Sequence, residues 1–179
     1  TIYGNKDVGF PWKSLLFGDI TVEAGKSLSL DSGLRTINSC ITLGDKAALR
    51  LGGTTADGQV ILSGDASIGG GVVGESLSVG DEKTLTLIGD LEGVGELSLG
   101  DKATLDLSEH ALSADVTLAG SSASIGNGTH HGTVSVDTGK TLNLSGDLDG
   151  AYWISLGDDA TLNLGKYALS KGVTLASSS

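Results

Sequence analysis

Short groups of three residues, with an apolar, a polar and an apolar position, return along the chain from residue 20 onward. Successive groups of a first set start about 19 residues apart. Alternation with a period of two is typical of a strand with one buried face, and β-branched residues are common in this set. The set comprises Ile20-Thr21-Val22, Ile41-Thr42-Leu43, Val60-Ile61-Leu62, Leu77-Ser78-Val79, Leu97-Ser98-Leu99, Val116-Thr117-Leu118, Val134-Ser135-Val136, Ile154-Ser155-Leu156 and Val173-Thr174-Leu175.

A second group follows each member of the first set, as Leu85-Thr86-Leu87 follows Leu77-Ser78-Val79. The residues between them are rich in Gly, Asp and Lys, and Gly and Asp tolerate left-handed backbone angles, so we expect the chain to turn there. A lone apolar residue then marks a weaker third side. The sequence therefore predicts units with three sides, the third marked by Leu34, Leu91, Leu112, Leu148 and Leu169.

Three such units form a longer repeat, because residues 97–122 return at 154–179, roughly 56 to 57 residues later, with most positions identical. Short strands with one apolar face cannot bury that face alone, whereas successive units stacked about 4.8 Å apart bury it continuously. The pattern predicts an all-β chain wound into a parallel β-solenoid, with coils of about 19 residues. Helix is disfavoured, since Gly makes up 29 of 179 residues and no segment has helical spacing. A β-sandwich of hairpins is the rival fold, but it does not explain one fixed repeat step.

We expect one elongated unit. Residues 1–17 break the pattern and hold most of the aromatic residues, so they are predicted to form an N-terminal cap over the first coil. Residues 18–179 are predicted to form the solenoid, truncated at its C-terminal end because the repeat stops partway through a unit. We expect no membrane insertion in this segment, which has no long apolar run. The single cysteine, Cys40, is interpreted as a packing residue.

Charge narrows the possible partners. A formal net charge of −11 argues against nucleic acid. Aspartates recur in the turn after the first strand, and we expect them to bond within that turn while nearby lysines reduce their repulsion. A calcium-binding ridge is the alternative, although the calcium-binding nonapeptide repeat does not occur. These aspartates are Asp45, Asp65, Asp81, Asp101 and Asp158.

The outward position of the first strand nearly always carries a hydroxyl, interrupted by Ile61. Ser and Thr suit exposed strand positions, so a structural role accounts for most of this column. Its regularity also predicts a lateral contact surface, and the hydroxyls are plausible acceptors for sugars. Ice or another lattice is a less favoured partner, because the preceding outward positions include Glu96, Asp115 and Trp153. The column consists of Thr21, Thr42, Ser78, Ser98, Thr117, Ser135, Ser155 and Thr174.

The outward positions of the second strand are also polar, and we expect them to stack as one column and bond between coils. Neither column gathers the carboxylates or basic groups that hydrolases and lyases need, so we expect no catalytic residue and no cofactor. His130 and His131 are predicted to lie in a Gly-flanked corner, far from a third ligand, which argues against a metal site. The second column consists of Ser29, Arg50, Ser67, Thr86, Asp106, Ser124, Asn143 and Asn163.

Units such as GTVSVDTGKTLNLSGDL and GDITVEAGKSLSLDSG resemble the strand repeats of bacterial autotransporter passenger domains and related large surface adhesins. The resemblance covers about residues 18 to 179 and is one of pattern. It implies a right-handed parallel β-helix that is displayed at a bacterial surface or released from it.

Together these observations predict a non-enzymatic surface or secreted β-helix that acts as an adhesin, a self-association module or a stalk. Its partner would be a host or bacterial surface glycan or protein, or a second copy of itself. The alternative is a fragment of a carbohydrate-active β-helix enzyme whose active groove lies on coils outside this segment. A solenoid that binds ice or another lattice is a third reading, and it requires a flat hydroxyl face.

Overall fold

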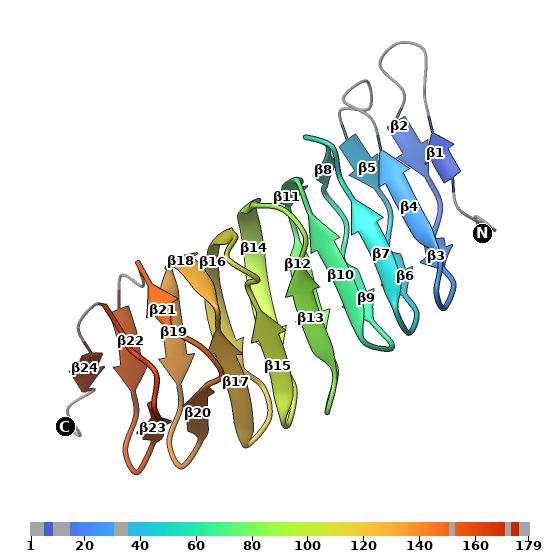
Figure 1. Ribbon diagram of the computed structural model, residues 1–179. Helices are drawn as coiled ribbons and strands as arrows, with labels where there is room; N and C mark the ends of the chain where they lie inside the picture. The colour runs from blue at the N-terminus through green and yellow to red at the C-terminus, as the bar shows by residue number, and fades with distance from the viewer. Residues whose placement is uncertain (1–5, 9–14, 31–35, 151–152, 171–172, 176–179) are drawn as a thin grey trace.

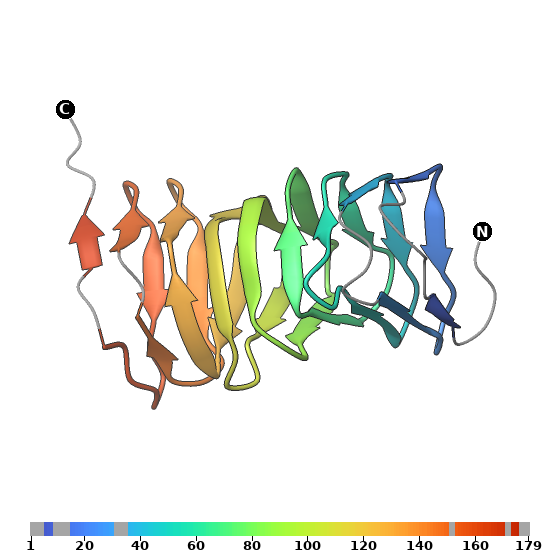
Figure 2. The same ribbon diagram turned by 90° about the horizontal axis from the view of Figure 1, so that it is seen from above.

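The computed structural model describes residues 6–8, 15–30, 36–150, 153–170 and 173–175. All paired strands run parallel, and no helix occurs among these residues. Figures 1 and 2 show the coils following one another along a single axis, with β1 (Lys6–Val8) and β24 (Val173–Leu175) at opposite ends of the rod. The predicted all-β parallel solenoid is confirmed, and pairing between residues 17 to 22 positions apart reproduces the expected step of about 19 residues.

The strands form three ladders, one for each side of the coil. Ladder one contains the first set of groups: β3 (Ile20–Val22), β6 (Ile41–Leu43), β9 (Val60–Leu62), β12 (Ser76–Val79), the second halves of β14 (Leu91–Leu99) and β16 (Ala111–Leu118), β19 (Thr133–Val136), β22 (Trp153–Leu156) and β24 (Val173–Leu175). Ladder two contains the second set: β1 (Lys6–Val8), β4 (Ser27–Leu30), β7 (Ala47–Arg50), β10 (Ala66–Gly69), β13 (Thr84–Leu87), β15 (Ala103–Asp106), β17 (Ser122–Gly126), β20 (Thr141–Leu144) and β23 (Thr161–Asn163).

Ladder three is the weaker side that the lone apolar residues predict. It contains β2 (Leu15–Phe17), β5 (Thr36–Asn38), β8 (Thr55–Ala56), β11 (Gly71–Val73), the first halves of β14 and β16, β18 (Gly128–His131) and β21 (Leu148–Asp149). Leu91, Leu112 and Leu148 are fully buried on this side, and Leu169 bridges to Leu148. Leu34 lies outside the described residues. The three-sided coil is therefore confirmed.

Two strands cross a corner without a break. β14 and β16 each run from ladder three into ladder one and pair with one another, with register shifts between Leu91 and Val94 and between Val94 and Leu97. Shifts of this kind bend a strand while it stays paired. Sides three and one consequently form one continuous sheet in the middle of the rod.

Stacked aliphatic side chains fill the interior. Val60, Leu77, Leu97 and Val116 pair in register on successive coils, and each is 0% exposed. Burying a side chain of this size stabilises the fold by about 1.5–3 kcal/mol, so each coil supplies its share of one shared core. A sandwich of antiparallel hairpins would not place these residues on one interior line.

The turn between sides one and two repeats one backbone geometry. Lys46, Lys102 and Asp159 have φ near +56°, and Gly25 and Gly139 take the left-handed region at the same place in their coils. The predicted turn is therefore present, and in the coils of Lys46, Lys102 and Asp159 the left-handed residue is the one that follows the Gly-Asp pair. Most L residues pay roughly 1–2 kcal/mol there, which explains the glycines in two of the coils.

The predicted cap lies largely outside the described residues. Within residues 1–17, β1 pairs with β4 and β2 pairs with β5, so these two short segments extend ladders two and three. Tyr3, Phe10 and Trp12 fall on residues outside the description. The cap, the truncation at the C-terminal end and the right-handed sense of the coil stay predictions.

Candidate lateral contact surface

Ladder one aligns the predicted hydroxyl column in a single file. Each member pairs with the equivalent residue of the next coil, from Thr21 with Thr42 to Ser155 with Thr174, and Ile61 interrupts the file between Thr42 and Ser78. The register holds because the aliphatic residues on either side of each hydroxyl point into the core, and a slip of one residue would expose them. The file comprises Thr21, Thr42, Ser78, Ser98, Thr117, Ser135, Ser155 and Thr174.

The hydroxyls lie on the outer face of ladder one. All members are half-buried except Thr174, which is exposed. The Thr117 hydroxyl donates to the Leu97 carbonyl oxygen of the preceding coil at 3.4 Å, so this member links two coils. With a strand spacing of about 4.8 Å, the file presents a row of donors and acceptors along the rod.

The outward positions just before the file do not form a second hydroxyl column. Ser76 pairs with Glu96, and Thr133 pairs with Trp153, whose side chain is 59% exposed. The backbone amide of Thr133 donates to Asp115 Oδ1 at 2.8 Å. This flank mixes acidic, hydroxyl and aromatic side chains, so it does not offer the paired flat columns that a lattice requires.

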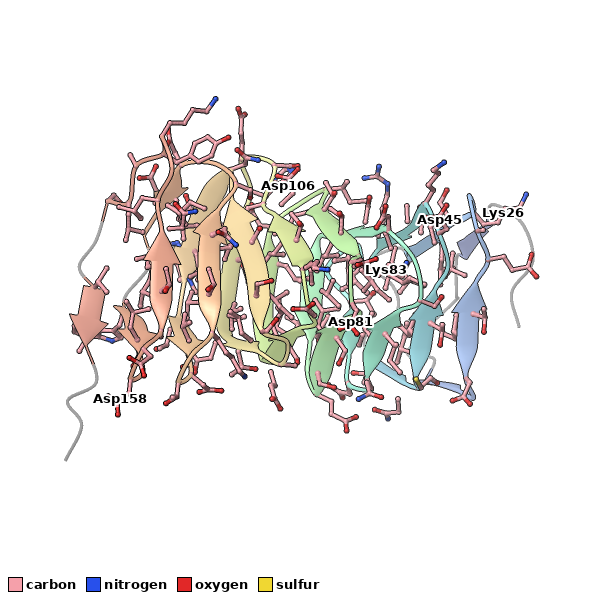
Figure 3. All side chains as sticks on the ribbon, turned by 90° about the horizontal axis from the view of Figure 1, so that it is seen from below. Lys26, Asp45, Asp81, Lys83, Asp106 and Asp158 are labelled. Atoms are coloured by element: carbon pink, nitrogen blue, oxygen red, sulfur yellow. The ribbon has the colours of Figure 1, made fainter. Side chains whose placement is uncertain are left out.

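Three of the predicted turn aspartates, Asp65, Asp81 and Asp101, accept hydrogen bonds from the neighbouring coil. Asp81 Oδ1 accepts the Asp101 amide at 2.7 Å, and Asp65 Oδ1 accepts the Thr84 amide at 2.8 Å. The expectation of bonds within one turn is wrong for these residues. These three aspartates therefore link successive coils, and Figure 3 shows the labelled Asp45, Asp81 and Asp158 at separate places along the rod.

Asp101 makes the most contacts of this kind. Its Oδ1 accepts the Ser121 hydroxyl, the Ser121 amide and the Ser122 amide. The Ser121 hydroxyl has the largest effect, and with the two amides and nearby Lys102 it holds the pKa of this carboxyl below its usual value of 3.8, although burial acts against it. Lys102 also pairs with Glu82 of the previous coil, with 3.4 Å between Nζ and Oε1.

The outward residues of ladder two do not stack as one column, contrary to expectation. Arg50 pairs with Gly69, whereas Ser67 pairs with Ala48, and Asp106 pairs with Gly126. Each slip is two residues, which keeps the aliphatic face inward and is therefore invisible in the apolar pattern. Short stacks remain, and in one of them Asn163 Nδ2 donates to Asn143 Oδ1 at 3.3 Å.

One of the histidines lies elsewhere than the sequence suggests. His130 belongs to strand β18 and is 0% exposed, so its placement in a corner is wrong. His110 Nδ1 is 3.6 Å from Asp90 Oδ1 on the preceding coil. Among the described residues, no group of three His, Cys, Asp or Glu side chains is arranged to hold a metal ion.

A shallow groove at the corner between sides two and three was missed by the sequence reasoning. Asp106, Asn127, Asp147 and Tyr167 line it on four successive coils, together with Glu109 and Asp149. Asp106 Oδ1 accepts the Asn127 side-chain amide at 3.1 Å, and Asp147 Oδ1 accepts the Ala168 amide at 2.8 Å. The only sequence signal for this groove is the return of polar residues about every 20 positions, which also describes the solvated surface of any coil.

The described part of the chain contains no helix long and apolar enough to cross a membrane. Comparison with protein-family models, curated proteins and solved structures finds no significant match. The repeat geometry and the surface that it presents are therefore the basis for a functional interpretation.

Proposed function

We propose that this chain is a non-enzymatic segment of a bacterial surface or secreted β-helix, and that it acts as an adhesin, a self-association module or a stalk. The observation that carries the proposal is the file of hydroxyls on ladder one, which register pairing aligns along the rod from β3 to β24. A solenoid gains length and lateral surface with each coil, at about 4.8 Å per coil. Weak contacts repeated along such a surface sum to a large avidity.

The hydrogen bonds of the described acidic residues support a non-enzymatic role over a catalytic one. Four aspartates each accept a hydrogen bond from a backbone amide of the next coil, and their carboxylates therefore hold neighbouring coils together. They are Asp65, Asp81, Asp101 and Asp115. General acid–base chemistry at a glycosidic bond needs two carboxylates facing one reacting centre. These aspartates instead bind one coil to the next, and this arrangement differs from a pair of carboxylates that face one reacting centre.

The proposed partners are a host or bacterial surface glycan or protein, or a second copy of this chain. Hydroxyl groups donate and accept hydrogen bonds, and they match the hydroxyls of sugars and the edges of other polar strands. The formal net charge of −11 disfavours nucleic acid. The resemblance of the repeat pattern to bacterial autotransporter passenger domains supports a location at the cell surface or in the medium.

The test is cell aggregation and glycan binding by cells that display the chain. Replacing Ser78, Ser98 and Ser135 with Arg puts long charged side chains into the file, and we expect at least a tenfold loss of aggregation or glycan binding. The matched control replaces Thr86 and Thr104 with Arg, since these residues are also half-buried and outward but lie on ladder two. Equal loss in both variants, with unchanged circular dichroism, would refute a role for ladder one.

The alternative, a fragment of a carbohydrate-active enzyme, draws support from the groove at the corner between sides two and three. Its lining includes Glu109 and Asp149 on separate coils, beside Tyr167. Incubation of this chain with surface polysaccharides, followed by assay of new reducing ends, tests this reading. Product release that Asp149→Asn abolishes would replace the non-enzymatic proposal.

A further inference from the structure

An imidazole occupies a leucine position in the core. His130 of β18 pairs with Leu112 of β16, which in turn pairs with Leu91 of β14. All three side chains are 0% exposed. The third side of the rod therefore carries, at one coil, a titratable group where the two preceding coils carry aliphatic ones.

Only one nitrogen of this ring has a partner. His130 Nε2 is 2.8 Å from the Ala114 carbonyl oxygen, which assigns the proton to Nε2 because a carbonyl oxygen can only accept. His130 Nδ1 is buried and has no hydrogen-bond partner. A neutral ring leaves an acceptor unpaired, whereas a protonated ring would leave a charged N–H donor unpaired, which costs considerably more in a dry core.

The charges that face His130 do not offset this cost. Burial has the largest effect and lowers the pKa of His130 from 6.5, while the bond to Ala114, and then Asp115 from β16, act in the opposite direction. His131, on the same strand, lowers it further. The remaining neighbour, β21, contributes Asp149, which is exposed and lies in line with Thr129 on the outer face.

We propose that His130 makes the rod acid-sensitive at one place, so that in mild acid the coil carrying β18 opens from β16 and β21 while other coils stay closed. The sign follows from linkage. The closed coil favours the neutral ring, so its stability is full above the ordinary histidine pKa of 6.5 and is lost as the pH falls through that value towards the lowered one. The inference does not depend on what the lateral surface binds.

Mild acid protonates histidine side chains while most acidic side chains stay ionised. Free Asp and Glu side chains titrate near pH 4, whereas His titrates between pH 5 and 8. Each pH unit through which only the open coil binds a proton changes the closing equilibrium by up to about tenfold. A drop from pH 7.5 to 5.5 is therefore enough to see the effect.

Hydrogen exchange with mass spectrometry, corrected for intrinsic exchange rates, resolves one coil from another. We expect exchange in residues 128–149 to rise by up to about tenfold per pH unit below 6.5, relative to exchange in residues 66–87. His130→Leu, which copies Leu112, should abolish the difference, and His131→Gln should retain it. An unchanged pH response in His130→Leu, or equal opening of residues 66–87, would overturn the proposal.

A titration of the unaltered protein covers the case in which His130→Leu does not fold. The proton on Cε1 of each histidine reports its protonation by NMR, and His130→Gln identifies the resonance. We expect the His130 resonance to titrate below 6.5, whereas titration at or above that value would refute the proposal.

Discussion

Adding one methyl group at two glycines tests the stacking of the coils. A Cβ on Gly132 would overlap the Ala114 carbonyl oxygen and lie 2.6 Å from the carbonyl carbon, both in the backbone of the preceding coil. A Cβ on Gly139 would meet no atom within 4 Å. Gly132→Ala therefore probes the contact between coils, while Gly139→Ala changes only the backbone preference at φ +71°.

The two costs differ in origin and in size. At Gly132 the strand must move away from Ala114, which costs about 1–3 kcal/mol for the overlap. The same movement weakens the 2.8 Å bond from the Thr133 amide to Asp115, worth about 1 kcal/mol. We expect Gly132→Ala to lower the free energy of unfolding by about 2–4 kcal/mol. Gly139→Ala should cost about 1 kcal/mol, because Lys102 already occupies the equivalent turn position with a side chain.

Urea unfolding followed by circular dichroism measures both variants against the parent chain. The midpoint should fall more for Gly132→Ala than for Gly139→Ala, with an unchanged slope if the denatured state is the same. Equal costs, or a larger cost at Gly139, would mean that Gly132 does not face Ala114. The register of ladders one and three around this corner would then be wrong.

Three further predictions follow from the described contacts. Leu97→Ala leaves a cavity in the aliphatic core and should cost about 2–5 kcal/mol, whereas Ser98→Ala on the outer face should change stability by less than about 1 kcal/mol, both measured by urea midpoints. Because the pKa of Asp101 is lowered, its carboxylate contributes to folding stability above pH 3.8, and this contribution is lost as the pH falls below that value. Asp101→Asn should therefore flatten the fall in stability between pH 6 and pH 3. An unchanged dependence of stability on pH would contradict this reasoning. Lys102→Gly relieves the left-handed conformation and removes an exposed ion pair and a positive charge near Asp101, so thermal unfolding should show equal or higher stability, by up to about 1 kcal/mol.

The sequence predicts the register of ladder one better than that of ladder two. In ladder one the outward residues Ser98 and Thr117 each lie between two buried aliphatic residues in a short group that a turn ends, so the two residues align without ambiguity. Ladder two has runs of alternating residues long enough to slip by two positions. Such a slip keeps the aliphatic face inward, which is why the stacking of Ser67 on Ala48 could not be foreseen.

The direction in which a side chain points is the second feature that the spacing of residues in the sequence does not predict. The position of Asp101 in its turn is readable from the repeat, but its bonds to Ser121 and Ser122 depend on which way the carboxylate leans across the stack. His130 was misplaced because the flanking glycines indicate a turn, whereas those glycines allow close approach of the neighbouring coil. A Cβ on Gly128 would lie 2.6 Å from Leu107 Cβ. Glycine in a solenoid therefore marks either a bend or a tight contact, and composition does not distinguish them.

The unbroken strands β14 and β16 have a mechanical consequence for a molecule of this shape. Hydrogen bonds of a β-solenoid point along its axis, so tension on the two ends loads them directly and coils should detach one at a time. Each released coil of about 19 residues frees roughly 60 Å of extended chain in exchange for about 4.8 Å of rod. Where β14 meets β16, two sides must separate together, so we expect this pair to resist longest and the rod to absorb a pull by lengthening from its ends.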